Sequence, residues 1–331
     1  MGLIITDNQH YSSIADAIRT KLGTNEAFLP AEMASAIMSI SGGGGITPSG
    51  TYSVSSNGTF DITNYASVDV DVHPAHEEYI QKYTSANALT TFTDSSATTV
   101  VYGAFAYTSS LNTVSFPEAT TIGNYAFAYC YNLRTISFPK VKTINTYAFQ
   151  YCSSMNYALT SANFPSLTGT LGGYAFRGCQ YLTGVSLPNI TSLGAQTFSA
   201  CSRITYVNLP NVTSIGAGAF SYLTTCSEYS LPKLTYVASN AFTSNWALET
   251  LTLPAATTIS AYAFRYCSSL MSLYLTGSTV PTLNKSAFLN MPFSVSVNNV
   301  YGSIYVPSSL YATYSTATNW TVYKDRLVSI T

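Results

Sequence analysis

Hydrophobic and polar positions alternate in short, regularly repeated segments along most of this chain. In one segment Ile136 and Phe138 are apolar, whereas Thr135 and Ser137 are polar, which is the period-two pattern of a β-strand. Pro139 follows directly and ends the strand, because proline cannot donate a hydrogen bond to a neighbouring strand. The pattern therefore predicts many short strands separated by turns.

The same unit recurs with a period of about 22 residues, which is typical of a repeat protein. It has the form L-x-x-V-x-L-P-x-x-T-x-I-x-x-x-A-F-x-x-C. One unit cannot bury its apolar side alone, so stacked units are expected to form a continuous core. The longest gap between successive phenylalanines of the repeat follows Phe149 and predicts a surface loop near Asn156–Ser161. The predicted core anchors are Phe105, Phe127, Phe149, Phe176, Phe198, Phe220, Phe242, Phe264 and Phe288.

A different pattern precedes the repeats. Ser12 can cap a first helix and Pro30 can begin a second one, whereas Val68 and Val70 belong to a strand-like alternation. The predicted divisions are a two-helix N-terminal segment (1–41), a glycine linker (42–45), a small β-module (46–73), a linker with a short helix at 77–83 (74–97), the repeat solenoid (98–300) and a C-terminal cap (301–331).

The repeat resembles the BspA-type, or treponemal, leucine-rich repeat over about residues 98–331. The residues that carry the resemblance are the L-x-x-I-x-L-P…I-x-x-x-A-F-x-x-C positions, which match in phase in eight or more units. The last residues, including Asn319-Trp320, resemble the terminal cap of such proteins. The resemblance implies an α+β repeat solenoid, a leucine-rich-repeat array of about nine coils with the period given above. It also implies a small helical and β N-terminal region and a C-terminal cap.

The N-terminal segment resembles the attachment segments of tailed-phage baseplate and tail-fibre proteins. The helix pair SIADAIRTKLG and PAEMASAIMSI and the later stretch Y-A-S-V-D-V-D-V carry this resemblance. It implies a virion protein of the tail or baseplate that docks on other tail proteins through residues 1–73. It also implies a homo-oligomer, usually a trimer, whose solenoid contacts a host cell-surface glycan or protein. The first residues lack the apolar core of a secretory signal, so synthesis in the host cytoplasm is expected.

Two alternatives remain open at this point. A bacterial surface adhesin can carry the same repeats, and a virion component can be purely structural, with no receptor role. A signal sequence or cell-wall anchor would favour the adhesin.

Charge is scarce and unevenly distributed. Asp, Glu, Lys and Arg make up 8% of the 331 residues, and the formal net charge is −1. Residues 1–100 carry 3 basic and 10 acidic residues, whereas residues 101–331 carry 10 and 4. The chain lacks the basic footprint of a nucleic-acid-binding protein, and no apolar run reaches the roughly 18 residues of a membrane span. Neither nucleic-acid binding nor membrane insertion is therefore expected, and the acidic N-terminal region is predicted to help orient the assembly.

The sequence does not predict an enzyme. General acid–base chemistry needs histidine or carboxyl groups with shifted pKa values, and residues 101–331 contain no histidine. Glu228 and Glu249 lie one unit apart near equivalent strand positions, which leaves a glycan hydrolase as an alternative. No phosphate-binding or dinucleotide-binding motif is present, so no cofactor is expected.

The six cysteines follow the repeat. Cys226 comes six residues after an anchor phenylalanine, and the other five each come three residues after one: Cys130, Cys152, Cys179, Cys201 and Cys267. Such positions predict reduced, buried cysteines that act as small hydrophobic residues. A disulfide or a metal site is the alternative for them, and metal is also the alternative for His73 and His76 in the predicted linker.

Two sets of outward positions are candidate binding residues for a neutral polymer such as a cell-wall glycan. The strand set is Tyr206, Asn208, Glu228 and Tyr274, and the set around the anchor phenylalanines is Tyr125, Tyr129, Tyr147, Tyr151, Tyr174, Tyr262 and Tyr266. Tyrosine offers a ring face and a hydroxyl group with few rotatable bonds. The alternative is that each tyrosine packs on the tyrosine of the next unit, because tyrosine is also a good strand residue.

Overall fold

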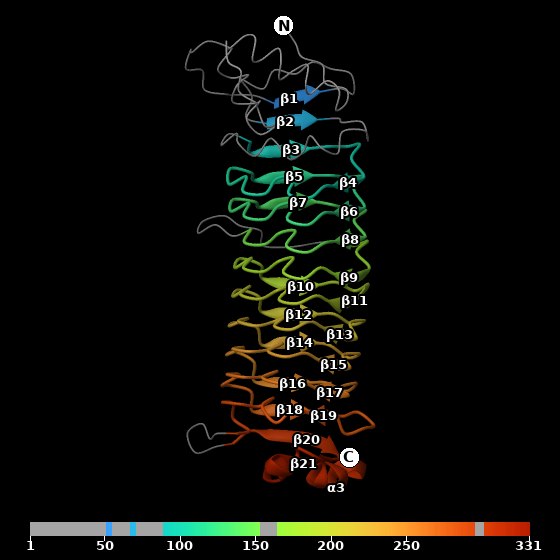
Figure 1. Ribbon diagram of the computed structural model, residues 1–331, viewed down its shortest axis with the longest axis vertical. Helices are drawn as coiled ribbons and strands as arrows, with labels where there is room; N and C mark the ends of the chain where they lie inside the picture. The colour runs from blue at the N-terminus through green and yellow to red at the C-terminus, as the bar shows by residue number, and fades with distance from the viewer. Residues whose placement is uncertain (1–50, 55–66, 71–88, 153–163, 295–300) are drawn as a thin grey trace, which may run out of the picture.

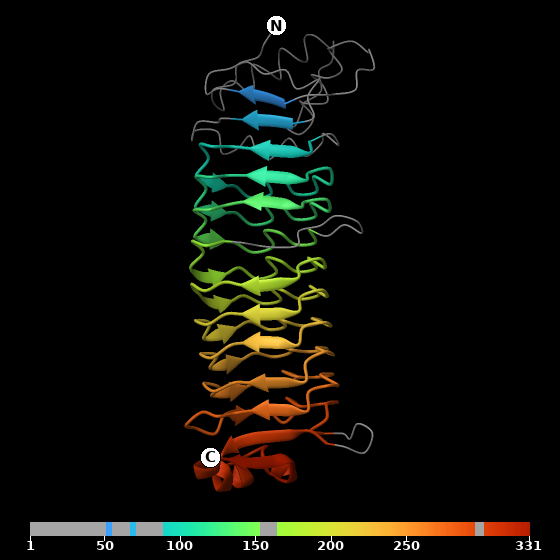
Figure 2. The ribbon, with the colours of Figure 1, turned by 180° about the vertical axis from the view of Figure 1, so that it is seen from behind.

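The protein is an elongated parallel β-solenoid. The computed structural model describes residues 51–54, 67–70, 89–152, 164–294 and 301–331. Strand β1 lies near one end of the long axis and helix α3 lies at the other (Figure 1). Each repeat unit makes one turn of the solenoid, and two ladders of short strands run along the axis on different sides of the turns (Figures 1 and 2).

The first ladder is made of the strands that the period-two pattern predicts. All of its printed strand pairs are parallel, and it is divided into three sheets, β1-β2-β3-β5-β7, β10-β12-β14 and β16-β18-β20-β21. The strands are β1 (Thr51–Val54), β2 (Ser67–Val70), β3 (Thr91–Thr93), β5 (Thr113–Ser115), β7 (Thr135–Ser137), β10 (Gly184–Ser186), β12 (Tyr206–Asn208), β14 (Glu228–Ser230), β16 (Thr250–Thr252), β18 (Ser272–Tyr274), β20 (Ser303–Pro307) and β21 (Leu327–Ile330).

The second ladder comes from the apolar pair that follows each proline. It forms the sheets β4-β6-β8 and β9-β11-β13-β15-β17-β19, and its strands are also parallel. The strands are β4 (Thr99–Val100), β6 (Thr121–Ile122), β8 (Thr143–Ile144), β9 (Gly169–Leu171), β11 (Ile190–Leu193), β13 (Ser214–Ile215), β15 (Tyr236–Val237), β17 (Thr258–Ile259) and β19 (Thr282–Leu283).

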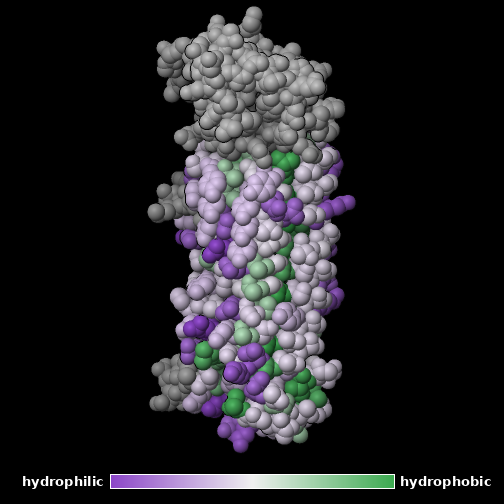
Figure 3. All heavy atoms as spheres, in the orientation of Figure 1, coloured by the Kyte–Doolittle hydropathy of each residue, from purple (hydrophilic) through white to green (hydrophobic). Residues whose placement is uncertain are grey.

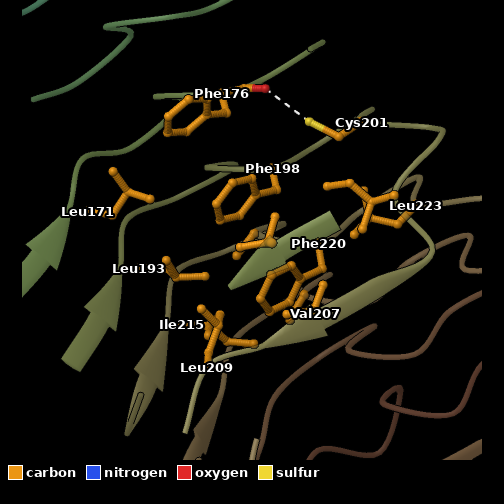
Figure 4. Packing of buried hydrophobic residues seen from close by; sticks show 14 of the residues in the cluster. Leu171, Phe176, Leu193, Phe198, Cys201, Val207, Leu209, Ile215, Phe220 and Leu223 are labelled. Carbon is orange, nitrogen blue, oxygen red and sulfur yellow. Dashed lines mark hydrogen bonds between the residues drawn. The ribbon is translucent and has the colours of Figure 1, made fainter. Parts of the chain in front are cut away.

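One continuous core fills the inside of the turns. The middle residue of most strands in the first ladder is buried, as Val207 and Leu251 are, while its neighbours along the strand are more exposed. All nine anchor phenylalanines are buried and stack from turn to turn along the axis. Figure 4 shows Phe176, Phe198 and Phe220 in this stack, with Leu193 and Ile215 beside them. The repeat thus supplies the same apolar contacts at every turn.

The C-terminal residues close the last turn. They form the short helices η3 (Ser308–Leu310), α3 (Tyr311–Thr316) and η4 (Thr321–Arg326) before β21 pairs with β20. The rings of Trp320 and Tyr323 contact the last anchor, Phe288, at centroid distances of 6.0 and 5.2 Å. The Trp320 indole N–H donates to the carbonyl of Pro281 at 2.8 Å. The end of the core is therefore covered by aromatic side chains, and the indole is bonded to the last turn.

Two sequence-based expectations about the architecture need correction. The α+β class is wrong for the described residues, because they form a parallel β-solenoid whose only helices are η3, α3 and η4. The solenoid also begins before residue 98, because β1 and β2 pair in parallel with β3 and continue the first ladder. These two strands belong to the predicted β-module of residues 46–73. The fixed period of the repeat could not identify them, since β2 and β3 are separated by a different spacing.

Several predictions fall outside the described residues. These are the two N-terminal helices, the glycine linker of 42–45, the helix at 77–83, the residues His73 and His76, and the loop near Asn156–Ser161.

Candidate functional site

Most turns carry two residues in the left-handed backbone conformation, one on either side of the anchor phenylalanine. They lie two positions before and two positions after the anchor. Glycine and asparagine adopt this conformation readily, and they occupy it at Gly178, Gly218 and Asn240. Tyrosine occupies it at Tyr107, Tyr125, Tyr129, Tyr147, Tyr151, Tyr174, Tyr222, Tyr262 and Tyr266, with φ between 56° and 63°.

These tyrosines form two columns, which together we name the tyrosine edge. The leading column contains the residues before each anchor, Tyr125, Tyr147, Tyr174 and Tyr262, and the trailing column contains those after it, Tyr107, Tyr129, Tyr151, Tyr222 and Tyr266. The backbone of the turns supports the columns, since the N–H of Phe127 donates to the carbonyl of Ala148 and that of Phe149 to Ala175, both at 2.7 Å.

The tyrosine rings stack in the N-terminal half of the solenoid. Centroids are 4.5 Å apart for Tyr125 and Tyr147 and 4.6 Å apart for Tyr147 and Tyr174. In the trailing column, Tyr129 lies 4.7 Å from Tyr107 and 5.4 Å from Tyr151. Most ring faces are therefore covered by neighbouring rings, so the column offers ring edges and hydroxyl groups rather than faces to a partner.

Stacking also keeps the hydroxyl groups protonated. Burial against neighbouring rings raises the pKa of Tyr125, and the nearby Tyr147 and Tyr102 raise it further. Burial likewise raises the pKa of Tyr129, with Tyr107 and Tyr151 as additional causes. At neutral pH these groups are uncharged hydrogen-bond donors and acceptors.

Two arginines interrupt the columns. Arg177 and Arg265 each come directly after an anchor phenylalanine and lie between a leading and a trailing tyrosine. The Tyr151 ring leans over Gly178, where a β-carbon would come within 2.3 Å of it. The edge thus changes from stacked tyrosines to isolated tyrosines near arginine.

The other predicted residues lie on the first ladder. Tyr206 and Glu228 are exposed and directly opposite each other in β12 and β14, and the Tyr206 ring occupies the space that Gly184 leaves free in β10. Asn208 donates to the Ser186 hydroxyl at 3.4 Å. Farther along the ladder, Tyr274 stacks on Tyr305 at 4.3 Å. The structure therefore separates the predicted residues into a ladder group and an edge group.

The surface has few strongly charged positions. In the view of Figure 3 most of the coloured surface is pale, with scattered strongly hydrophilic residues and a narrow hydrophobic stripe along the axis. Lys140 and Glu118 form an ion pair at 2.6 Å. Within the described ranges no three His, Cys, Asp or Glu side chains gather as a metal site would require. No described helix is long and apolar enough to span a bilayer.

The cysteines are buried and reduced, and they also make hydrogen bonds. All six are free thiols. Five of them donate to the carbonyl of the anchor phenylalanine in the preceding turn, at 2.9 to 3.1 Å, as Cys201 does to Phe176 (Figure 4). Burial raises the pKa of the thiols, to about 12 for Cys267 and about 11 for Cys226. The five donating cysteines therefore satisfy buried carbonyl groups that a hydrocarbon side chain would leave unpaired.

One turn replaces the thiol with a different buried network. Asn245 stands where a cysteine is expected and donates to the carbonyls of Phe220 and Phe242 at 2.8 and 2.7 Å. The Tyr229 hydroxyl donates to Asn245 Oδ1, and the Tyr229 ring packs edge-on against both phenylalanines. Tyr229 stands where the repeat has valine or leucine, so the two substitutions in the repeat pattern compensate each other.

Replacing Tyr229 with phenylalanine is expected to lower the free energy of unfolding by about 1–3 kcal/mol, because Asn245 Oδ1 loses its buried donor. The double variant Tyr229→Val with Asn245→Cys restores the usual repeat and is expected to recover more stability than the two single variants add up to. Urea unfolding of the four proteins measures the coupling. Strictly additive losses would show that the two side chains act independently.

Sequence reasoning missed several residues of this surface. Tyr107 and Tyr222 obey the spacing rule of the trailing column and could have been found by it. Tyr305 lies in the last unit, where the spacing changes. Arg177 and Arg265 share a position with residues as different as Ala128 and Thr243, so no repeated residue type marks them.

Comparison with solved structures supports the fold. A leucine-rich repeat protein from Bacteroides ovatus aligns with 85% of this chain and 69% of its own, at 18% identity and a TM-score of 0.59. A leucine-rich cell surface protein from Faecalibacterium prausnitzii aligns with 77% of this chain and 91% of its own, at 17% identity and a TM-score of 0.33. A leucine-rich repeat protein from T. pallidum aligns with 46% and 86%, at 26% identity and a TM-score of 0.34.

Sequence comparison identifies the repeat itself. No curated protein matches the chain. The family model of the BspA type leucine rich repeat region, which spans six copies, matches residues 76–188, 154–271 and 191–317. These matches cover more than half of the sequence and run through the whole array of anchor phenylalanines. The chain therefore belongs to the BspA-type leucine-rich repeat family.

Proposed function

We propose that this protein is a non-catalytic surface adhesin that uses its solenoid to bind a glycan or protein on a cell surface. The observation that carries the proposal is the retention of tyrosine at left-handed positions along an exposed edge. Each such residue costs on the order of 1 kcal/mol relative to glycine. The glycines at Gly178 and Gly218 show that the turn accepts the relaxed alternative.

Stacking can offset this cost only where rings meet. A stacked aromatic pair contributes about 0.5–1.5 kcal/mol, which accounts for the columns between Tyr107 and Tyr174. Tyr222 stacks on no other ring among the described residues, because its equivalents in the adjacent turns are Ala200 and Ser244. It is 51% exposed. A strained, unstacked and exposed tyrosine is better explained by a partner than by stability.

The BspA-type family supports the same proposal. Solved structures that share the fold include bacterial leucine-rich repeat proteins. A repeat solenoid offers an extended surface and no enclosed cavity, which suits adhesion better than catalysis.

Replacing Tyr222 with asparagine separates binding from stability. Asparagine tolerates the left-handed conformation, so we expect the variant to be as stable as the parent or slightly more stable. Binding to intact bacteria or to purified cell-wall polysaccharides is expected to weaken about 3- to 10-fold, as the loss of one aromatic contact predicts. Sedimentation assays with labelled full-length protein measure the difference.

Tyr236→Asn is the matched control, because Tyr236 is 45% exposed and lies on the second ladder, in β15. The control is expected to bind like the parent. If Tyr222→Asn also binds like the parent, or if the parent binds no surface at all, the adhesin proposal fails.

A role in a phage tail is a second proposal, and it depends on the N-terminal residues. The helix-like segments within residues 1–41 resemble tail attachment segments, and this role would place other tail or baseplate proteins, and further copies of this chain, against residues 1–73. Immunogold labelling of the full-length protein in the producing strain distinguishes the two locations. Label on purified particles supports the virion role, whereas label on the cell envelope alone contradicts it.

A further inference from the structure

Two arginines on the tyrosine edge occupy the same kind of environment. The guanidinium carbon of Arg177 lies 5.6 and 5.8 Å from the ring centroids of Tyr151 and Tyr174. The guanidinium carbon of Arg265 lies 5.4 and 4.6 Å from those of Tyr262 and Tyr266. All four tyrosines have left-handed backbones. The same strained arrangement is therefore built twice, with a cation between two aromatic rings.

Neither positive charge is neutralised within the described residues. Arg177 and Arg265 form no ion pair with a described carboxylate, and Glu118 is engaged by Lys140 on another part of the surface. Arg265 donates through Nη2 to the Tyr266 hydroxyl at 2.9 Å, while its buried Nε–H has no acceptor among the described atoms. In a sequence with 8% charged residues, two oriented and unpaired guanidinium groups on one edge are unusual.

We propose that Arg177 and Arg265 are two anion subsites that bind the acidic groups of a polyanionic glycan. The proposal rests on the proposed function and names its ligand class. A guanidinium group binds carboxylate or phosphate oxygens through two parallel N–H donors, and the flanking rings hold its plane in place. The neighbouring tyrosine hydroxyls add uncharged donors for sugar oxygens.

The spacing along the axis favours a polymer over a small ligand. The anchors Phe176 and Phe264 are four turns apart, which corresponds to roughly 19 Å at the spacing of parallel strands. Tyr222 belongs to the turn midway between them and exposes its ring. Aligned with the two arginines, the intervening positions are small and uncharged: Ser199, Ser221 and Thr243. An extended chain can thus place acidic groups at both ends and a sugar ring against the tyrosine.

The test measures binding of the full-length protein to three polymers of matched length. The probes are polygalacturonate, which carries carboxylates, poly(glycerol phosphate), which carries phosphodiesters, and neutral dextran. We expect at least one acidic polymer to bind more tightly than dextran, with weaker binding at high salt. The comparison of the two acidic probes identifies the anion.

The arginine variants locate the binding. Arg177→Gln and Arg265→Gln are each expected to weaken binding of the acidic polymer about 10-fold or more, and the double variant is expected to abolish it. Arg177→Lys keeps the charge but loses the two-donor geometry, so it is expected to bind more weakly than the parent. The double control Lys142→Gln with Lys233→Gln removes the same charge away from the tyrosine edge and is expected to bind normally. Circular dichroism shows whether each variant is folded.

Three outcomes would overturn the inference. If folded arginine variants bind like the parent while Tyr222→Asn binds less, the inference fails and the adhesin proposal stands. If the lysine control weakens binding as much as the arginine variants, the attraction is general and not local. If single-stranded DNA binds as tightly as the acidic glycan, the site does not recognise a glycan. Failure of every polymer and every cell surface to bind would remove both proposals together.

Discussion

Replacing Phe198 with alanine is expected to lower the free energy of unfolding by about 3–5 kcal/mol. Phe198 is 1% exposed and lies in the middle of the anchor stack, 5.6 Å from Phe176 and 6.2 Å from Phe220 by ring centroids. The substitution removes a whole ring from a close-packed core and breaks the contacts with both neighbouring turns. Equilibrium unfolding in urea measures the loss.

Two variants control this prediction. Phe198→Leu keeps most of the apolar volume and is expected to cost clearly less than alanine. Tyr236→Ala removes an exposed ring from the second ladder and is expected to change stability by less than about 1 kcal/mol. An equal loss for Phe198→Ala and Tyr236→Ala would contradict a continuous aromatic core.

Raising the pH from about 7 to about 9.5 is expected to destabilise the reduced protein by several kcal/mol, through the buried cysteines. A thiol in the unfolded chain has a pKa of about 8.5, whereas burial raises the pKa of Cys267 to about 12 and that of Cys226 to about 11. Because the folded pKa is raised, the stabilisation is complete below the unfolded pKa and is lost as the pH rises toward the folded pKa. The cost is about 1 kcal/mol per buried thiol at about pH 9.5.

Urea unfolding at several pH values, with a reducing agent present, measures this dependence. A double variant, Cys201→Ala with Cys267→Ala, removes two of the titrating groups. It is expected to be less stable than the parent at neutral pH, because two carbonyl groups lose their donors, but to have a shallower loss at alkaline pH. A parent protein whose urea midpoint is unchanged at about pH 9.5 would contradict the burial of the thiols.

The repeat made much of the fold predictable from the sequence. The alternation around Ile136 predicts β7, and the spacing of the anchor phenylalanines predicts the stacked core, because each unit repeats the same local contacts. The positions of the cysteines followed from the same period. Single-residue periodicity therefore determined the cross-section of the solenoid.

The remaining features depend on contacts between turns, which one sequence does not show. Whether Tyr147 meets a partner or its neighbour Tyr174 depends on the spacing and direction of adjacent turns. The left-handed backbone at Tyr125 contradicts the usual preference of tyrosine, so local propensity pointed away from it. The pairing of Tyr229 with Asn245 joins positions in different turns, and no rule of spacing connects a strand residue with a thiol position.

The functional prediction was less complete than the structural one. The repeats are those of a bacterial-type leucine-rich repeat family, which supports the adhesin alternative more than the tail-fibre hypothesis. The tail-fibre hypothesis depends on residues 1–73, of which the structure describes only β1 and β2. The arginine subsites arise from two departures from the repeat consensus, so the consensus could not reveal them.

The in-register pairing of equivalent strands has an evolutionary consequence. Gly184, Tyr206 and Glu228 are successive partners in one sheet although each lies one whole repeat unit further along the chain. Recombination between misaligned repeats inserts or deletes a whole unit, and the strands on either side of the junction can still pair. The length of the molecule therefore changes in steps of about 4.8 Å without loss of the core. Such steps also change the distance between Arg177 and Arg265, so gene duplication can adjust the molecule to acidic polymers with different spacings.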